Sequence, residues 1–159
     1  MSVNEQTVGP DALVTLREVT GETVGRICRL SDTLSAEQQK MVAPNAYSIA
    51  QAHFEKHAWF RAVYADDVPV GFVMLYDDAE REHVYLWRFM IAGSHQKKGY
   101  GRRALELVFD HARARSKVRE VKASYVPIEG GAGPFYRKHG FEPTGEMEGE
   151  EVVIRRALR

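Results

Sequence analysis

The 159-residue sequence contains a single cysteine, Cys28, and carries no excess of charge of either sign. One cysteine excludes an internal disulfide and a cysteine metal cluster, which suits a reducing cytoplasm. The 22 basic and 22 acidic side chains give a formal net charge of zero, whereas a protein that binds nucleic acid normally has a basic excess. No stretch approaches the roughly 18 apolar residues that cross a membrane, and no signal-peptide core is visible. We therefore expect a cytoplasmic protein with no nucleic-acid, membrane or metal partner.

What the sequence does contain is an ordinary globular composition, with 44% hydrophobic and 28% charged residues. A chain of this length fits one domain whose core is large enough to need no covalent staples. The polar segment 1–12 predicts a flexible N-terminal tail, so the folded domain is expected over residues 13–158. Cys28 lies in an apolar stripe with Ile27, which predicts a buried core thiol rather than a reactive nucleophile.

Apolar patterning and breaker residues divide the domain into strands and helices. Strands are expected over 14–19, 59–64, 70–76, 83–91, 118–126, 141–147 and 151–158. Helices are expected over 23–30, from Ser35 onward, over 48–57 with Ser48 as its cap, over 101–116 and over 134–139. This order predicts a mixed α+β domain, antiparallel at its start and with a parallel βαβ unit in its middle. A crevice suited to a ligand is expected between strands 84–91 and 118–126.

A glycine loop, residues 96–102, joins the central strand to the longest predicted helix. Gly99 and Gly101 let the chain turn tightly, so that successive N–H groups can converge on a phosphate at the positive end of the helix dipole. Basic side chains surround this loop: Lys97, Lys98, Arg102 and Arg103. The pattern Q-x-x-G-x-G differs from the loops of dinucleotide-binding folds and of nucleotide triphosphatases. The alternative is a plain glycine turn with solvated lysines.

Three segments of the chain resemble the GNAT superfamily of acetyl-CoA-dependent N-acetyltransferases. They are LWRFMI at 86–91, QKKGYG at 96–101 and GPFYRKHGF at 133–141. The resemblance implies a single N-acetyltransferase domain over 13–158, with a central mixed sheet of six to seven strands and about four flanking helices. In that fold the sheet splays between strands 84–91 and 118–126. Segments 42–48 and 86–91 are also similar to bacterial diamine acetyltransferases, which implies a polyamine substrate such as spermidine or spermine.

The resemblance assigns the glycine loop to coenzyme A, the co-substrate that it implies. Its pyrophosphate belongs at the N–H groups of 97–102, and Gln96 lies beside it or braces the turn. The main chain of 89–91 is expected to bond the pantetheine arm, with one N–H group polarising the thioester carbonyl. The expected cofactor-binding residues are Phe89, Met90, Ile91, Gln96, Lys97, Lys98, Gly99, Tyr100, Gly101 and Arg102.

The implied reaction is direct attack of an uncharged amine on the thioester, with no protein nucleophile. Tyr136 occupies the family position of the acid that protonates the leaving thiolate; the alternative is a buried ring that bonds a carbonyl. Tyr85 stands where some relatives carry a glutamate base. His83, Glu82 or Glu55 acting through water, or remaining solvated, are the alternatives that the residues leave open.

A polyamine needs carboxylates for its distant ammonium groups and an aromatic trough for its methylenes. The expected substrate-binding residues are Glu55, Glu82, Tyr85, Trp87 and Glu129, with Glu22, Glu37 and Tyr47 as further candidates. Two other functions stay open: a non-catalytic acyl-CoA-binding regulator, and an acetyltransferase acting on a protein or amino-acid amine. The resemblance also admits a homodimer.

Overall fold

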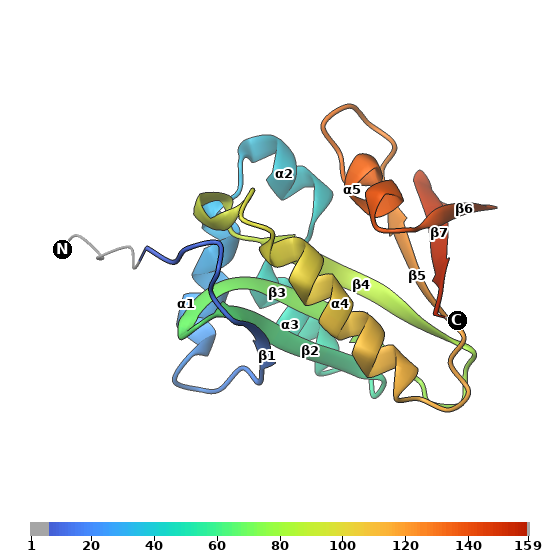
Figure 1. The fold of residues 1–159 in the computed structure, drawn as a ribbon, viewed down its shortest axis with the longest axis horizontal. Helices are drawn as coiled ribbons and strands as arrows, with labels where there is room; N and C mark the ends of the chain where they lie inside the picture. Colours follow the sequence, from blue (N-terminus) through green and yellow to red (C-terminus); the bar gives the residue numbers. More distant parts are fainter. Residues whose placement is uncertain (1–6, 159) are drawn as a thin grey trace.

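The computed structural model describes residues 7–158, and its central feature is one seven-stranded sheet (Figure 1). The strands are β1 (Val14–Arg17), β2 (Ala58–Ala65), β3 (Val68–Tyr76), β4 (His83–Ile91), β5 (Glu120–Tyr125), β6 (Glu142–Glu148) and β7 (Glu151–Ala157). Across the sheet their order is β1-β2-β3-β4-β5-β7-β6. Every neighbouring pair is antiparallel except β4 and β5, which are parallel. The predicted mixed sheet is confirmed.

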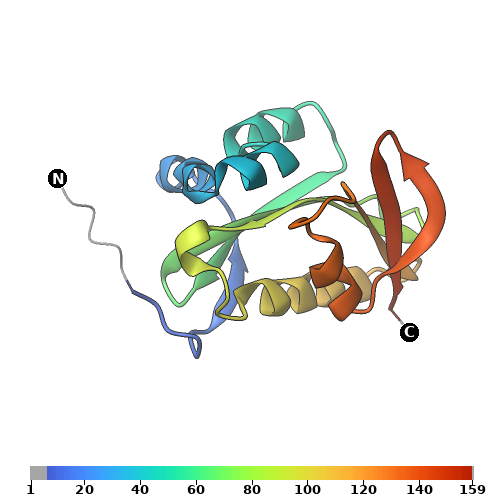
Figure 2. The same ribbon diagram turned by 90° about the horizontal axis from the view of Figure 1, so that it is seen from above.

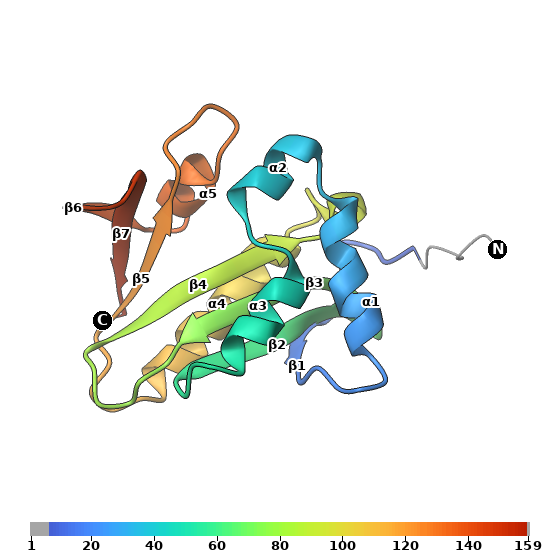
Figure 3. The ribbon, with the colours of Figure 1, turned by 180° about the vertical axis from the view of Figure 1, so that it is seen from behind.

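Helices cover both faces of this sheet, as the view from above in Figure 2 shows. One face carries α1 (Val24–Arg29), the 3-10 turn η1 (Leu30–Thr33), α2 (Ala36–Met41) and α3 (Asn45–Ala52). The other face carries α4 (Tyr100–Arg113), which follows the 3-10 turn η2 (Gly93–His95), and α5 (Gly133–Lys138). Seen from behind in Figure 3, α1 to α3 lie over the first four strands and leave β5, β7 and β6 uncovered. None of the helices within 7–158 combines the length and apolar character that a membrane span requires.

The helix α4 is amphipathic, and this fixes its place. Its buried residues Ala104, Leu105, Val108 and Phe109 share one face, as predicted, and belong to the same core cluster as Val84 of β4. As the crossover between two parallel strands, α4 must start near the C-terminal end of β4. The glycine loop is therefore carried to the edge of the sheet at which β4 and β5 end.

The helix α3 corrects the sequence prediction of a helix over 48–57 capped by Ser48. It spans Asn45–Ala52 and follows Pro44, whose extended backbone ends the preceding segment. The buried Asn45 side chain donates from Nδ2 to the Ile27 carbonyl at 2.8 Å, which ties the start of α3 to α1. Ser48 is fully buried inside the helix. The sequence prediction placed Asn45 in a connecting segment. The hydrogen bond from Asn45 to α1 joins residues far apart in the sequence, so no local pattern reveals it.

The region of α1 and α2 confirms one prediction and corrects another. Ser35 precedes α2 and accepts a hydrogen bond from the N–H of Gln38, while the Gln38 side chain accepts from the Ser35 N–H, forming a capping box. Cys28, expected to be buried, is only half-buried; in its stripe Ile27 alone is fully buried. A six-residue helix presents only one turn to the core, so the flanks of its apolar stripe stay at the surface.

Part of the expected N-terminal tail is packed against the domain. Residues 1–6 of that tail lie outside the described residues, but Val8 and Ala12 are buried. Lys98 Nζ donates to the Val8 carbonyl at 3.1 Å, and Arg103 Nη1 donates to the Ala12 carbonyl at 2.7 Å. Val8 and Ala12 are thus tied to the loop before α4 and to α4 itself. Polar composition does not reveal that backbone carbonyls accept these side-chain hydrogen bonds.

Candidate active site

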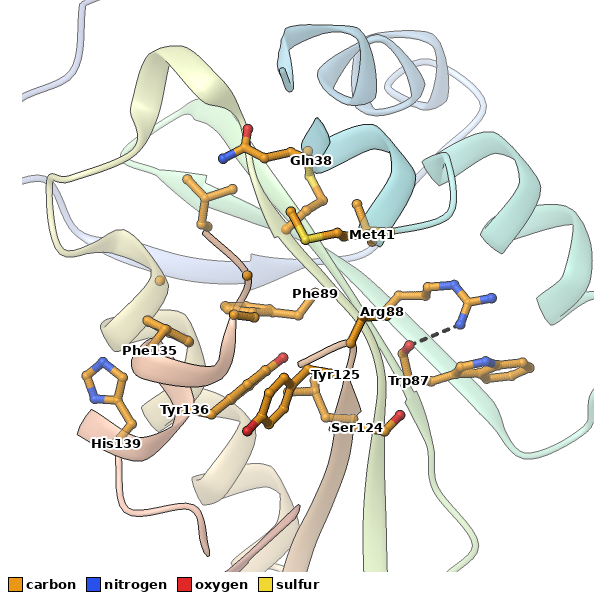
Figure 4. Close-up of a pocket in the computed structure, with 18 of the residues that line it drawn as sticks. Gln38, Met41, Trp87, Arg88, Phe89, Ser124, Tyr125, Phe135, Tyr136 and His139 are labelled. Carbon is orange, nitrogen blue, oxygen red and sulfur yellow. Dashed lines mark hydrogen bonds between the residues drawn. The ribbon is translucent and has the colours of Figure 1, made fainter. Parts of the chain in front are cut away.

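A cavity of about 1200 Å³ opens where β4 and β5 separate (Figure 4). Its walls come from β4, the end of β5, the loop before α4, the end of α2, and the loop and first turns of α5. This is the place at which the sequence predicted a ligand crevice. Within the described residues, no three His, Cys, Asp or Glu side chains are grouped so as to hold a metal ion.

The main chain of β4 is exposed to the cavity because its pairing with β5 is short. The two strands pair from His83↔Glu120 to Leu86↔Ala123, and the pairing stops there. Beyond Leu86 the β5-facing edge of β4 has no strand partner, so its N–H and C=O groups face the opening. The expected splay of the sheet is thus present. All three residues predicted to bond a pantetheine arm lie on this free edge and line the cavity: Phe89, Met90 and Ile91.

The glycine loop has a backbone that suits an anion. Lys97 and Gly99 both adopt left-handed conformations, with φ of 65° and 81°, and such turns expose successive N–H groups on a concave side. The bonding of α4 begins with Arg103 N donating to Gly99 O at 3.3 Å, so the N–H groups of the first turn remain unused by the helix. The loop residues that line the cavity are Gln96, Lys97, Gly99, Tyr100, Gly101 and Arg102.

The side chain of Gln96 braces the loop. Its Nε2 donates to the Ile91 carbonyl at 3.0 Å, and its Oε1 accepts from Gln38 Nε2 of α2 at 3.3 Å. The loop is thereby connected to the end of β4 and to the helix across the cavity. Of the two roles expected for Gln96, these contacts supply the bracing one.

Two of the expected phosphate ligands point elsewhere. Lys98 does not line the cavity; its ammonium group bonds the Val8 carbonyl. The Tyr100 ring is buried, and its hydroxyl group donates to the carbonyls of Val8 and Gly9. The Lys98 and Arg103 side chains, both expected near the phosphate, donate to carbonyl groups of the N-terminal segment instead. The basic side chains of the loop that line the cavity are Lys97 and Arg102.

Tyr136 lies in α5 with its ring directed toward β4, next to Tyr125 (Figure 4). It is 8% exposed and also contacts the rings of Phe135 and Phe141. Burial raises the pKa of Tyr136 above the ordinary tyrosine value, and negative charge on Tyr85 and Glu151 raises it further. The hydroxyl group therefore keeps its proton throughout the physiological pH range, as a proton donor must.

Two carboxylates that the sequence analysis did not select, Glu148 and Glu151, line the cavity. Tyr85 donates from its hydroxyl group to Glu148 Oε2 at 2.8 Å. Burial, aided by this bond, raises the pKa of Tyr85 to about 12. The sequence predicted the hairpin that carries both glutamates. It gave no sign that β7 inserts beside β5, where Tyr125↔Val152 pairing brings the hairpin turn to the cavity.

The five residues predicted to bind substrate divide into two groups. Tyr85 and Trp87 line the cavity. Glu55 accepts the N–H of His57 at 3.2 Å, Glu82 forms an exposed ion pair with Arg119 at 3.5 Å, and Glu129 is exposed on the loop after β5; none of these three lines the cavity. A carboxylate on a turn next to β4 or β5 therefore does not by itself predict a substrate ligand, since the topology of the sheet determines which turns face the cavity.

His83, an open candidate for the base, lines the cavity, as Tyr85 does. Burial lowers the pKa of His83, and the positive charges of Lys122 and Arg81 lower it further. The imidazole is therefore neutral at physiological pH.

Comparison with known proteins gives the family and agrees with the fold. A family model described as the acetyltransferase (GNAT) family matches residues 18–141. The chain belongs to this family. Its members are acetyltransferases that use acetyl-CoA, so the predicted enzyme class, co-substrate and GNAT fold are confirmed. A search of the curated proteins found no match.

Solved structures agree with this assignment. A putative GNAT-family acetyltransferase from Desulfovibrio desulfuricans has a TM-score of 0.72 at 18% identity, over 92% of this chain and 100% of that one. The PaiA N-acetyltransferase of Thermoplasma acidophilum, in complex with coenzyme A, has a TM-score of 0.66 at 15% identity, over 91% and 99%. N-acetylglutamate synthase from Neisseria gonorrhoeae has a TM-score of 0.71 at 19% identity; 94% of this chain matches 36% of that one. At these identities the likeness shows the fold alone.

Proposed function

We propose that this acetyltransferase moves an acetyl group from acetyl-CoA to the primary amine of a small molecule, with both substrates bound at once. One observation carries the proposal. The β4–β5 pairing ends at Leu86↔Ala123, so that a free strand edge opens directly beside the left-handed loop at the start of α4. A free edge and an anion loop are the two backbone features that an extended, pyrophosphate-bearing thioester requires.

The chain's own groups fit the co-substrate. We assign the pyrophosphate to the N–H groups of 97–102, with Lys97 and Arg102; the left-handed backbone of Lys97 and Gly99 supports this assignment. The free edge of β4 at Phe89 and Met90 supplies N–H and C=O groups for the pantetheine arm and one N–H to polarise the thioester carbonyl. Bound acetyl-CoA supplies the activated acyl group. Gln96 holds the loop in position relative to β4 through its bond to Ile91.

Two side chains carry the proton transfers in this proposal. The amine nitrogen bonds the thioester carbon while the carbon–sulfur bond breaks; Tyr136 gives its proton to the sulfur, and a glutamate accepts the proton that leaves the amine. We assign the second role to Glu151. It lines the cavity and, among the contacts of the described residues, forms no hydrogen bond or ion pair, whereas Glu148 is engaged by Tyr85. Solvent then returns a proton to Tyr136 and removes the proton from Glu151.

The identity of the amine stays a prediction. A polyamine is favoured by Glu148 and Glu151 and by the aromatic walls of Tyr85 and Trp87. It is disfavoured by the absence of the three predicted acidic ligands from the cavity and by the presence of Arg81 and Arg88 there. A cytoplasmic location and a homodimer likewise remain predictions.

The experiment measures free-thiol release from acetyl-CoA with a panel of polyamines, amino acids and peptide N-termini. Thiol release that requires an amine and is lost in Tyr136→Phe supports the enzyme proposal. Uptake of acetyl-CoA by calorimetry without thiol release from any amine would instead support a non-catalytic regulator. That alternative draws on one observation, the absence of a carboxylate at Tyr85, where some relatives carry their base.

A further inference from the structure

Arg88 is an arginine in the candidate active site that forms no ion pair with any of the described residues. It lines the cavity and is half-buried, and among residues 7–158 no carboxylate lies within ion-pair distance of it. Its Nε is buried without a hydrogen-bond partner among the described residues. Burial lowers the pKa of Arg88, because the charged form has lost water, and the negative charge of Glu151 offsets this only in part. A half-buried guanidinium group with no ion-pair partner is stabilised when a ligand brings an anion into direct contact with it.

The position of Arg88 follows from a bulge in β4. The β3–β4 register passes from Met74↔Arg88 to Leu75↔Leu86, so Trp87 is an extra residue. Leu86 and Phe89 pack with the core on the α4 side, whereas Trp87 packs with the core on the α1–α3 side and Arg88 bonds α3. The consecutive side chains of Trp87 and Arg88 therefore both lie on the face of the sheet that α1 to α3 cover. Without the bulge, strict alternation would send Arg88 toward α4.

The guanidinium group is held in place by neutral contacts. Nη1 donates to the Trp87 carbonyl at 3.1 Å, Nη2 donates to Gln51 Oε1 of α3 at 3.2 Å, and the group lies 5.4 Å from the Trp87 ring centre (Figure 4). These contacts use two of the five N–H donors of an arginine, and each terminal nitrogen retains one. The fork is pre-positioned, which favours recognition of a planar carboxylate.

The cavity is therefore charged with opposite signs on two walls. Arg88 lies on the β4 wall, and Glu148 and Glu151 lie at the turn between β6 and β7. A molecule with an ammonium group and a carboxylate matches both walls. A polyamine matches only the glutamates and brings a positive charge toward Arg88, which costs affinity.

We propose that Arg88 binds a carboxylate of the acyl acceptor, so that the acceptor is an aminocarboxylic acid and not a polyamine. This inference rests on the proposed function and names the substrate class of the same site. Arg88 would be a specificity-determining residue, with Glu151 facing the amine that is acetylated.

The test compares amino acids with their own amides in the thiol-release assay, using glycine, β-alanine and 4-aminobutyrate, each against its carboxamide, with spermidine included. An α-amide such as glycinamide has the more acidic ammonium group and so more free amine at neutral pH, so a carboxylate preference is not produced by amine ionisation. We expect the best aminocarboxylate to exceed its amide by at least about tenfold in kcat/KM. Arg88→Gln should remove this preference by raising KM for the carboxylate, with little change for the amide.

Arg61 provides a matched control. Its guanidinium group also lies over a tryptophan ring, 4.4 Å from that of Trp59, and Nη1 also bonds the preceding carbonyl, that of Phe60, at 2.7 Å, but it does not line the cavity. Arg61→Gln should keep the carboxylate preference, and Arg88→Lys should keep part of it. Thermal unfolding and acetyl-CoA calorimetry of the Arg88 variants verify that fold and co-substrate binding are intact.

Three results overturn the inference, and they differ in what they leave standing. Thiol release that favours spermidine or the amides, or an equal loss of all activities in Arg88→Gln, overturns the aminocarboxylate acceptor and leaves the acetyltransferase proposal standing. Absence of thiol release with every acceptor overturns the proposed function and the inference with it.

Discussion

The strands β3 and β6 belong to one sheet but have opposite surroundings. In β3, seven consecutive residues from Pro69 to Leu75 are buried, with helices over both faces; in β6 no residue is buried. The first four strands therefore form a core wall, and β5, β7 and β6 form a second wall with one face uncovered. The two walls are joined by four residue pairs between β4 and β5. The comparison teaches that stability is concentrated in one wall and that the site occupies the place where the walls part.

The largest contrast is expected in stability. Phe72→Ala removes a fully buried ring from β3 and should lower the free energy of unfolding by about 3–5 kcal/mol. Met147→Ala truncates a side chain of β6 that is 59% exposed and should change it by less than about 0.5 kcal/mol. Urea denaturation followed by circular dichroism measures both. Similar losses in the two variants would show that the second wall is not the marginal one.

The next effect concerns the place where β4 and β5 separate. There α5 brings a proton donor to the free edge of β4. Tyr136→Phe should lower kcat about 100-fold, the lower range for loss of general acid catalysis, with acetyl-CoA affinity retained. Because burial raises the pKa of Tyr136, the wild-type rate should show no alkaline decline from this group until the pH exceeds the ordinary tyrosine value of about 10. A pH–rate profile for kcat checks this. Full activity in the variant would return Tyr136 to its alternative role as a buried packing residue.

A smaller effect, on acetyl-CoA affinity, should distinguish backbone strain in the glycine loop from backbone strain in β6. Gly99 and Gly145 have φ of 81° and 87°, a region in which a β-branched side chain is strained. Gly99→Val should weaken acetyl-CoA binding by about tenfold or more, because the anion loop must change shape. Gly145→Val imposes the same strain on β6 and should leave the affinity unchanged. Isothermal calorimetry with acetyl-CoA distinguishes the two variants. Equal affinities in both would show that the glycine loop does not bind acetyl-CoA.

The same division explains what the sequence could and could not predict. Periodicity identified α4 and the central strands, because their apolar patterns are long and local. Gly99 and the resemblance located the glycine loop that we assign to the co-substrate, although Lys98 and the Tyr100 hydroxyl group bond the N-terminal segment instead. Tyr85 and Trp87 were predicted and line the cavity, but its two glutamates were missed, because Glu148 reaches the cavity only through the insertion of β7 beside β5, which no local pattern encodes. Arg88 was hidden by the bulge at Trp87, since a one-residue shift reverses the face that alternation assigns.

The smallest expected effect tests how firmly the second wall is joined to the first. Tyr85 of β4 reaches Glu148 of β6, and its pKa is raised to about 12 in the folded state against about 10 in an unfolded chain. A group with a raised folded pKa contributes stability that is present below the unfolded value and is lost as pH rises through the folded one. Between pH about 10 and 12 the unfolded chain loses this proton first, so wild-type stability should fall more steeply than that of Tyr85→Phe. Urea midpoints at a series of alkaline pH values measure the difference. Parallel curves for the two proteins would mean that the hydroxyl bond between the two walls does not persist in solution, and that β4–β5 pairing and the shared core around α4 hold the walls together.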